Sequence, residues 1–514
     1  MNAAFPFLRR PAALRQRQFD LLVIGGGIYG AWVACDAAQR GLSVALVEQG
    51  DWGCGTSSAS SKLIHGGLRY LENYQFEFVR HALRERRRLR RIAPHLVRPL
   101  DFIMPVWKGP RASTFTLSAG LMLYDLFGAG RGSVGRHRQY RPAGLLSEFP
   151  FLDPQNLEAG FRYGDCQADD ARMVLAVAAA AQAHGAACVN RMQAERLLED
   201  EGGVRGALLR DRETQESFEL HARVTVNAAG PWAAGLLGDA APPQRLVQGT
   251  HLVMPAIPGC QEAFLLTARD GRVFFVIPWY GRTLVGTTER EVAAPGDARP
   301  TPEETRYLLE GLRSGLPGLR WTEKDVIAGF CGLRVLQPAE YGSLSQMTRE
   351  AAIVRPRPRL VSYVGGSFTA ARRDAAHIVD AAYWQMSETP RPCRTRETAL
   401  PGTPDEPFEH WQPQAVERLI AAGVDEEAAQ SLSLRHGTAI ALLLQRMEEH
   451  PELRARIHPE LPFLLAEVVH ALQAEMARDI DDVLRRRLPL QLLLPDDDWR
   501  GRVENLIGRY RTTV

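Results

Sequence analysis

The fold is decided by the stretch from Phe19 to Glu48, which reads FDLLVIGGGIYGAWVACDAAQRGLSVALVE. Its first six residues are apolar apart from Asp20 and predict a buried strand, and the glycine run after them predicts a tight turn into a helix. A second apolar run at residues 43–47 predicts the next strand and leads directly into Glu48. The stretch therefore predicts a strand–helix–strand unit with parallel strands.

The glycines of this unit follow the pattern G-x-G-x-x-G at Gly25, Gly27 and Gly30, and Glu48 lies eighteen residues beyond the last of them. In dinucleotide-binding proteins the first glycine permits the turn, the second lets the backbone approach a pyrophosphate, and the third lets helix and strand pack closely. The helix N-terminus offers free N–H groups to the phosphates, and the acid binds ribose hydroxyls. The complete unit predicts a dinucleotide site without distinguishing FAD from NAD.

The overall composition is that of an ordinary globular protein. Of the 514 residues, 45% are hydrophobic and 24% charged, which favours two or three domains. The net charge of +2 disfavours a protein that mainly binds nucleic acid. Seven scattered cysteines, with no CxxC or HExxH motif, indicate a reducing, cytoplasmic compartment and no metal site. Because only three of the 62 basic residues are lysines, an arginine alone is weak evidence of function.

The segment at residues 56–70 reads TSSASSKLIHGGLRY and is too polar and glycine-rich for a second strand–helix unit. It predicts a hydroxyl-lined loop that wraps more of a dinucleotide. With this loop, residues 19–105 resemble the FAD-dependent (aerobic, respiratory) sn-glycerol-3-phosphate dehydrogenase family. The resemblance extends to about residues 19–514 through further motifs, which are YGDC at 163–166, NAAGPW at 227–232, GTH at 249–251, GLR at 332–334, GG at 365–366 and MARD at 476–479.

The resemblance implies an α/β protein with three parts. A Rossmann-like FAD-binding domain is expected from residues 19–95, 160–245 and 345–388, after a basic tail at 1–18. An inserted antiparallel β-sheet substrate (cap) domain is expected from residues 96–159 and 246–344, which are richer in proline, aromatics and short apolar runs. A linker at 389–407 then leads to a C-terminal α-helical domain at 408–514, where apolar residues recur with helical spacing.

The expected cofactor is non-covalent FAD, because the glycine turn, the hydroxyl-lined loop and the late double glycine supply contacts along a whole flavin dinucleotide. The residues expected to bind it are Gly25, Gly27, Gly30, Glu48, Thr56, Ser57, Ser61, Lys62, Leu63, His65, Gly66, Gly67, Ala229, Gly230, Gly365, Gly366, Ser367 and Thr369.

The resemblance implies oxidation of sn-glycerol 3-phosphate to dihydroxyacetone phosphate, with hydride passing to flavin N5 and electrons passing on to quinone. His251 is expected to take the hydroxyl proton as a neutral imidazole, unless it is an ordinary core histidine. Arg334, in an apolar context, needs an anionic partner, which is either the substrate phosphate or an internal carboxylate. Arg69, Tyr70 and Arg349 are similar to family residues that face the substrate, while Tyr70 also suits a core position.

Two positions depart from the family pattern. Ser367 replaces the family's lysine in the segment GGSFTAAR, and Glu289 replaces the aspartate that usually follows Gly-Thr-Thr. The loss of the lysine charge leaves two alternatives open beside glycerol-3-phosphate dehydrogenase. One is a flavoenzyme that acts on a different polar secondary alcohol, and the other is a flavin-binding homologue with impaired catalysis. Arg372 or Arg373 would compensate only if the helix turned one of them inward, and we expect incomplete compensation.

The predicted helix at residues 72–92 carries seven arginines and an apolar stripe of Phe76, Val79 and Leu83. Such a helix can lie on the inner, anionic face of a cytoplasmic membrane, although a solvated helix packed on the flavin domain is the favoured interpretation. We expect weak, salt-sensitive peripheral association and no membrane-spanning segment. A homodimer is compatible with the sequence.

Overall fold

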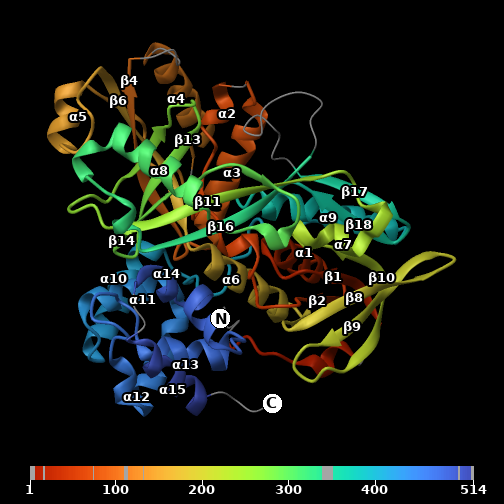
Figure 1. Cartoon of the computed structure of the whole chain (residues 1–514). Helices are drawn as coiled ribbons and strands as arrows, with labels where there is room; N and C mark the ends of the chain where they lie inside the picture. The colour runs from red at the N-terminus through yellow and green to blue at the C-terminus, as the bar shows by residue number, and fades with distance from the viewer. Residues whose placement is uncertain are drawn as a thin grey trace.

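The computed structural model describes residues 6–15, 18–72, 74–108, 114–130, 132–337, 351–495 and 498–510. It has an α/β architecture with two sheets and a C-terminal group of helices (Figure 1). The strand–helix–strand unit predicted from the glycine motif is confirmed as β1 (Phe19–Ile24), α1 (Ile28–Gln39) and β2 (Val44–Val47).

Within the described residues, eight strands form the sheet that contains this unit, in the order β17-β18-β10-β1-β2-β7, with β9 and β8 extending from β10. The strands from β18 to β7 are parallel, and β17, β9 and β8 are antiparallel. The remaining bounds are β7 (Ala187–Val189), β8 (Met192–Asp200), β9 (Gly203–Asp211), β10 (Ser217–Asn227), β17 (Ala352–Arg357) and β18 (Leu360–Val364).

Helix α1 is the most enclosed helix beside this sheet, because every residue from Ile28 to Ala38 is buried. It contacts α6 (Asp170–Ala183) and α9 (Ala371–Gln385), which flank it. The start of α1 lies very close to the preceding turn. A Cβ atom added to Gly30 would lie 1.8 Å from the carbonyl oxygen of Gly25, so a side chain at this position would push the helix away from β1.

The second sheet has ten described strands and runs in the order β15-β11-β14-β13-β12-β4-β6-β3, with β16 beside β11 and β5 beside β6. It is antiparallel as predicted, except that β12 and β4 are parallel. Strand β6 continues through residue 160, so the predicted domain boundary falls within a strand. The bounds are β3 (Leu63–Ile64), β4 (Val97–Trp107), β5 (Arg138–Tyr140), β6 (Leu157–Ala168), β11 (Arg245–Pro255), β12 (Ala263–Thr267), β13 (Val273–Trp279), β14 (Arg282–Gly286), β15 (Arg290–Val292) and β16 (Ala328–Leu336).

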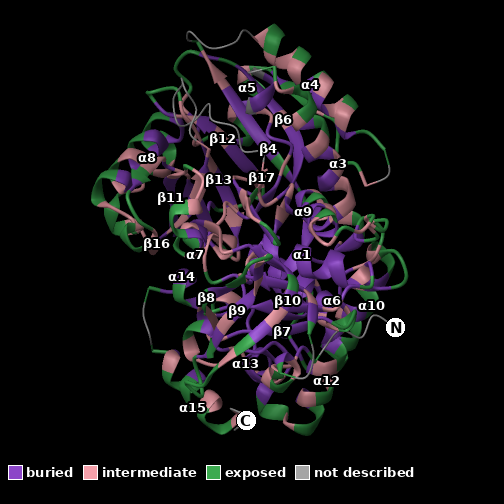
Figure 2. Cartoon of the chain, turned by 90° about the vertical axis from the view of Figure 1, so that its right-hand side faces the viewer, coloured by how far each residue is buried: buried purple, intermediate pink, exposed green. Residues whose placement is uncertain are grey.

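Further helices lie between and beside the strands of the two sheets. They are α2 (Arg69–Glu72), α3 (Phe76–Ile92), α4 (Thr114–Gly128), α5 (Pro142–Glu148), α7 (Ala233–Leu237) and α8 (Pro302–Gly315). Helices α4 and α5 lie at the end of the molecule opposite the C-terminal helices α12 and α15 (Figures 1 and 2).

The C-terminal part of the chain is helical, as the spacing of its apolar residues predicted, and six α-helices are described there. They are α10 (Phe408–Ala421), α11 (Glu426–His436), α12 (Ile440–Glu449), α13 (Leu465–Ala474), α14 (Leu490–Leu493) and α15 (Arg500–Tyr510), with a π-helical turn at Asp482–Arg487. Part of this region shares a core with the ten-stranded sheet, since Phe463, Leu484 and Trp499 belong to the same buried cluster as Phe330 and Trp279. Figure 2 shows buried residues continuing from the sheets into the C-terminal helices.

Buried ion pairs join the C-terminal helices to α6 and to one another. Arg172 at the start of α6 bonds both oxygens of Glu475, at 2.6 and 2.8 Å. Arg435 and His436 of α11 share the buried Glu467, whose pKa is about 2 because the neighbouring guanidinium and imidazole outweigh the cost of burial. Breaking such a pair leaves a buried charge uncompensated, which typically costs about 3–5 kcal/mol.

We predict that the protein loses stability as the pH falls below about 6.5. Burial lowers the pKa values of His95, His251 and His436 to about 3, so these rings are neutral in the folded chain and take up protons on unfolding. The unfolded state then binds more protons between pH 6.5 and 3, and unfolding becomes easier by about 1.4 kcal/mol per pH unit for each extra proton. Thermal unfolding measured from pH 7.5 to 4.5 should show the fall.

The exposed His410 provides a matched control for this measurement. A His410→Gln variant should keep the parent's pH dependence, whereas His95→Gln should reduce its slope. A melting temperature that stays constant from pH 7 to 5 would contradict the interpretation.

Candidate active site

A cavity of about 680 Å³ lies between the two sheets. Most of the predicted site residues line it, although they come from distant parts of the chain. On the cofactor side these are Gly25, Gly27, Glu48, Thr56, Ser57, Ser61, Leu63, His65, Gly67, Ala229, Gly230, Gly365, Gly366, Ser367 and Thr369, and on the substrate side Tyr70, His251 and Arg334.

Three predicted cofactor residues do not line the cavity. Gly30 acts in the packing of α1 against β1 described above. The Gly66 N–H donates to Tyr124 Oη at 2.8 Å. The ammonium of Lys62 is buried and bonds both oxygens of Asp170, at 2.7 and 2.8 Å, so it points away from the cavity. A buried ammonium needs such a partner, and Asp170 neutralises it.

Two of the predicted substrate residues have side chains outside the described part of the chain. Arg349 lies outside the described residues, and so does the side chain of Arg69, whose backbone begins α2. Tyr70 is buried, lines the cavity and packs edge-to-face on Phe78 at 4.7 Å between ring centroids. Tyr70 therefore occupies a core position and also reaches the cavity wall.

The glycine turn offers a cradle for phosphates. Gly25 has φ of +112°, a conformation that favours glycine. Gly27 precedes the first residue of α1, and the Ile28 N–H donates to Ser57 Oγ at 2.9 Å, which ties the hydroxyl-lined loop to the helix start. The helix N-terminus and the loop hydroxyls thus face one cavity, an arrangement that fits the pyrophosphate of a dinucleotide.

Glu48 supports the backbone around the glycine turn. Its two oxygens accept hydrogen bonds from the N–H groups of Gly26 at 2.6 Å and Gly50 at 2.7 Å. Burial raises the pKa of Glu48 above its usual value. A carboxylate can accept about four hydrogen bonds, so the predicted contact with ribose hydroxyls remains compatible with both backbone bonds.

His251 lies on β11 in the wall of the cavity. Its Nε2 lies 2.8 Å from Ser61 Oγ, and its ring stacks on Phe330 with centroids 5.0 Å apart. Burial, Lys62 and Arg334 lower its pKa to about 3, so the imidazole is neutral at physiological pH. Among the described residues its buried Nδ1 has no hydrogen-bond partner. Nε2, beside the cavity-lining Ser61, is therefore the ring nitrogen on the cavity side, and its lone pair can accept a proton when the ring hydrogen is on Nδ1.

Arg334 has an internal carboxylate partner, one of the two alternatives left open by the sequence. Its Nη1 lies 3.3 Å from Glu289 Oε1, and its Nη2 lies 3.2 Å from Thr287 Oγ1. All three side chains line the cavity. Glu289, noted in the sequence only as a departure, therefore sets the charge around Arg334.

The late double glycine is held by Tyr29, which sequence reasoning did not single out. Gly365 and Gly366 have φ of +87° and +101°, and a Cβ on Gly366 would lie 2.1 Å from Tyr29 Oη. The Tyr29 hydroxyl donates to Asp374 Oδ2 at 2.6 Å and accepts the Ser367 N–H at 3.1 Å. An aromatic residue inside the glycine motif, directly before Gly30, was the available signal.

Ser367 lines the cavity, and its Oγ accepts the Ala370 N–H at 3.3 Å. Arg372 does not supply the missing charge. It is buried and forms a bidentate pair with Glu85 at 2.6 and 2.8 Å, in agreement with the expectation of incomplete compensation.

One group in the described part of the chain could offer three metal ligands, namely His436, His470 and Glu475. Arg172 already binds both oxygens of this glutamate, and Arg446 lies 3.2 Å from Nδ1 of His470. Two guanidinium charges at this distance repel a cation, so we interpret the group as part of the interdomain network.

Known proteins resemble this chain in sequence over most of its length. Residues 20–367 match the model of the FAD-dependent oxidoreductase family, and residues 393–500 match the C-terminal domain of alpha-glycerophosphate oxidase. The chain is 32% identical over 511 residues to a glycerol-3-phosphate dehydrogenase from Synechocystis sp., covering 95% of this chain and 92% of the relative. It is 35% identical over 506 residues to one from Pseudomonas aeruginosa, covering 94% of each.

A solved structure extends the likeness to three dimensions. The glycerol-3-phosphate dehydrogenase from Bacillus halodurans complexed with FAD superposes with a TM-score of 0.78 at 28% identity, covering 97% of this chain and 91% of that chain.

Proposed function

The chain belongs to the family of FAD-dependent glycerol-3-phosphate dehydrogenases, and from that premise we propose that it oxidises sn-glycerol 3-phosphate to dihydroxyacetone phosphate and passes the electrons to a quinone. The observation that carries this proposal is the position of His251, a neutral imidazole in the wall of the same cavity that contains the dinucleotide cradle. A secondary alcohol bound there would meet a base.

The chain's own residues can manage the proton. FAD supplies the hydride acceptor when bound. Ser61 lines the cavity and its Oγ lies 2.8 Å from His251 Nε2, so Nε2 would take the hydroxyl proton of the substrate, directly or through the Ser61 hydroxyl, while the buried Nδ1 carries the ring hydrogen. Lys62 and Arg334 lower the pKa of His251 along with burial. A substrate phosphate near Arg334 would counteract that electrostatic lowering and make the imidazole a stronger base.

The phosphate of the substrate would bind beside Arg334. A guanidinium carries five N–H donors and can bind a phosphate through two of them at once, and Arg334 lines the cavity beside Glu289 and Thr287. The ion pair with Glu289 keeps the guanidinium in the cavity wall, and it also offsets part of the positive charge of Arg334. Ser367 adds a hydroxyl where the family's lysine would add a charge.

Peripheral membrane contact, which we also propose, would use a surface other than the predicted stripe of α3. Val79 and Leu83 are fully buried, and Arg86 is bonded to Asp165, so most of the apolar stripe of α3 packs inward and only Phe76 at its start is exposed. Helix α4, which packs on α3, instead exposes apolar side chains, with Phe115 83%, Met122 64% and Leu126 69% exposed. Such a face can enter the bilayer interface while the arginines of α3 attract anionic lipid.

Among the described residues, no helix combines the length and the apolar character needed to cross a bilayer.

The proposed reaction predicts that sn-glycerol 3-phosphate reduces the bound flavin under anaerobic conditions and that His251→Ala slows this step by about 10²–10⁴-fold, the usual contribution of a general base. Stopped-flow absorbance of the flavin measures the rate. Ser61→Ala should slow it by about tenfold or less, because one hydrogen bond that orients the ring is lost. Equal reduction rates in parent and His251→Ala would assign His251 to packing alone.

A second prediction concerns the missing lysine. Ser367→Lys should raise kcat/KM for sn-glycerol 3-phosphate by about tenfold or more, because a hydrogen bond to a charged group contributes about 1.5–3 kcal/mol. Ser367→Met is the matched control for side-chain length without charge and should give no gain. If the parent is already fully active and the lysine changes nothing, another group holds the phosphate.

A third prediction tests the membrane surface. The parent should sediment with anionic vesicles at low salt and less so as salt rises, because surface attraction decays within a Debye length of about 8 Å at physiological ionic strength. Met122→Glu combined with Leu126→Glu should abolish sedimentation. Ile420→Glu, at an exposed apolar residue of α10, should leave it unchanged. No sedimentation of the parent at low salt would sink the membrane proposal.

A further inference from the structure

The segment from Glu48 to Cys54 forms the outer wall of the proposed adenosine site. Glu48, Gln49 and Cys54 line the cavity. The segment also supports the glycine turn directly, since the Gly53 N–H donates to the carbonyl oxygen of Gly26 at 3.0 Å. A Cβ added to Gly26 would lie 2.6 Å from the ring of Trp52, which is fully buried. The shape of the cradle therefore depends on the shape of this segment.

The centre of this segment is held by the C-terminal part of the chain. Asp51 is buried, and both of its oxygens bind guanidinium groups of consecutive arginines. Arg487 binds the two oxygens, with 2.9 Å from Nη2 to Oδ1, and Arg486 binds Oδ2 through Nε. Burial alone would raise the pKa of Asp51, but the two arginines lower it below its usual value. Asp51 is therefore a buried carboxylate that requires its partners.

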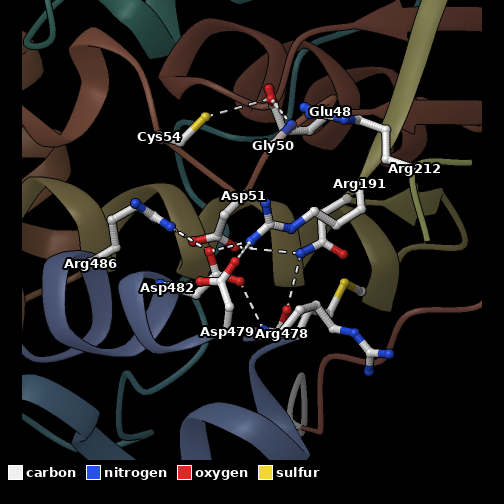
Figure 3. A network of polar contacts seen from close by, with 12 residues as sticks. Glu48, Gly50, Asp51, Cys54, Arg191, Arg212, Arg478, Asp479, Asp482 and Arg486 are labelled. Atoms are coloured by element: carbon white, nitrogen blue, oxygen red, sulfur yellow. Dashed lines mark hydrogen bonds and ion pairs between the residues drawn. The ribbon is translucent and has the colours of Figure 1, made fainter. Parts of the chain in front are cut away.

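Further contacts tie the same two regions together. Arg487 Nη2 donates to the Glu475 carbonyl oxygen at 2.6 Å, and Trp52 Nε1 lies 3.4 Å from Met476 Sδ. On the other side, Asp482 binds both Arg486 and Arg191, and the Arg191 N–H donates to the carbonyl oxygen of Gly50 at 2.9 Å. Figure 3 shows Arg486, Asp51, Asp482 and Arg191 pointing toward one another, with Glu48, Gly50 and Cys54 beside them.

We propose that Arg486 and Arg487 are positioning residues for FAD, because they hold Asp51 and so fix the segment 48–54 that binds the adenosine half of the cofactor. This inference rests on the proposed placement of FAD, with its ribose at Glu48. It assigns the C-terminal helical region a role in cofactor affinity, although Arg486 and Arg487 do not line the cavity.

Arg486 is the better residue to change. Its side chain is 10% exposed, whereas that of Arg487 is 1% exposed. In Arg486→Gln, Asp51 keeps Arg487 and Asp482 keeps Arg191, so no buried carboxylate loses all of its partners. The variant should therefore fold. Arg478→Gln is a matched control, because Arg478 also joins the C-terminal region to the flavin side, through Glu213 at 2.6 Å, without contacting Asp51.

The test measures the dissociation constant of FAD by flavin fluorescence after dilution of the holoenzyme, and that of ADP by competition. Arg486→Gln should weaken FAD binding about tenfold, since a charge-assisted hydrogen bond is lost. ADP, which contains only the adenosine half, should weaken by the same factor. Arg486→Lys should recover part of both affinities. Arg478→Gln should lower the melting temperature without changing either constant.

Two results would overturn the inference. If Arg486→Gln binds FAD within twofold of the parent while its melting temperature falls, the arginine serves domain packing alone. If FAD weakens but ADP does not, the effect lies outside the adenosine half. These readouts do not involve the substrate, so they stand apart from a failure of the proposed reaction, and a parent that binds no FAD would refute the cofactor premise itself.

Discussion

The architecture depends on one close approach, that of α1 to the turn that precedes it. A Cβ on Gly30 would lie 1.8 Å from the Gly25 carbonyl oxygen, so α1 can lie against β1 only without a side chain there. This contact aims the helix N-terminus at the cavity, buries α1 against α6 and α9, and brings Tyr29 to the loop that contains Gly366. The cofactor cradle and the support of the late flavin loop thus follow from a single packing constraint.

Around that constraint, arginines act mainly as internal connectors. Arg172 binds Glu475, Arg372 binds Glu85 and Arg487 binds Asp51, and each pair joins segments that are far apart in sequence. A buried pair adds little net stability over apolar packing, but losing one partner is costly, so such pairs penalise arrangements in which the segments separate. Some of the many arginines therefore fix the position of one part of the chain relative to another, and others lie on the surface.

The cavity itself combines a neutral base with a restrained positive charge. Burial and two nearby cations keep His251 deprotonated, while Glu289 holds Arg334 and offsets part of its charge. Lys62 is neutralised by Asp170 within hydrogen-bond distance. The site thus presents hydrogen-bond donors to an anion while its charged side chains are paired. Pairing limits the cost of burying these charges in the cavity wall before the substrate binds.

The sequence by itself determined the strand–helix–strand unit, the two sheets followed by C-terminal helices, and a set of site residues most of which line the cavity. These follow from local periodicity and from glycine spacing, which act over a few residues, and from long motifs. Only the tertiary structure decided the partners of charged side chains. Lys62 turns to Asp170, Arg334 to Glu289 and Arg372 to Glu85, and most of the apolar stripe of α3 packs inward while α4 is exposed. The physical reason is that a long charged side chain takes whichever opposite charge the folded chain brings within hydrogen-bond reach, and sequence spacing does not encode that proximity.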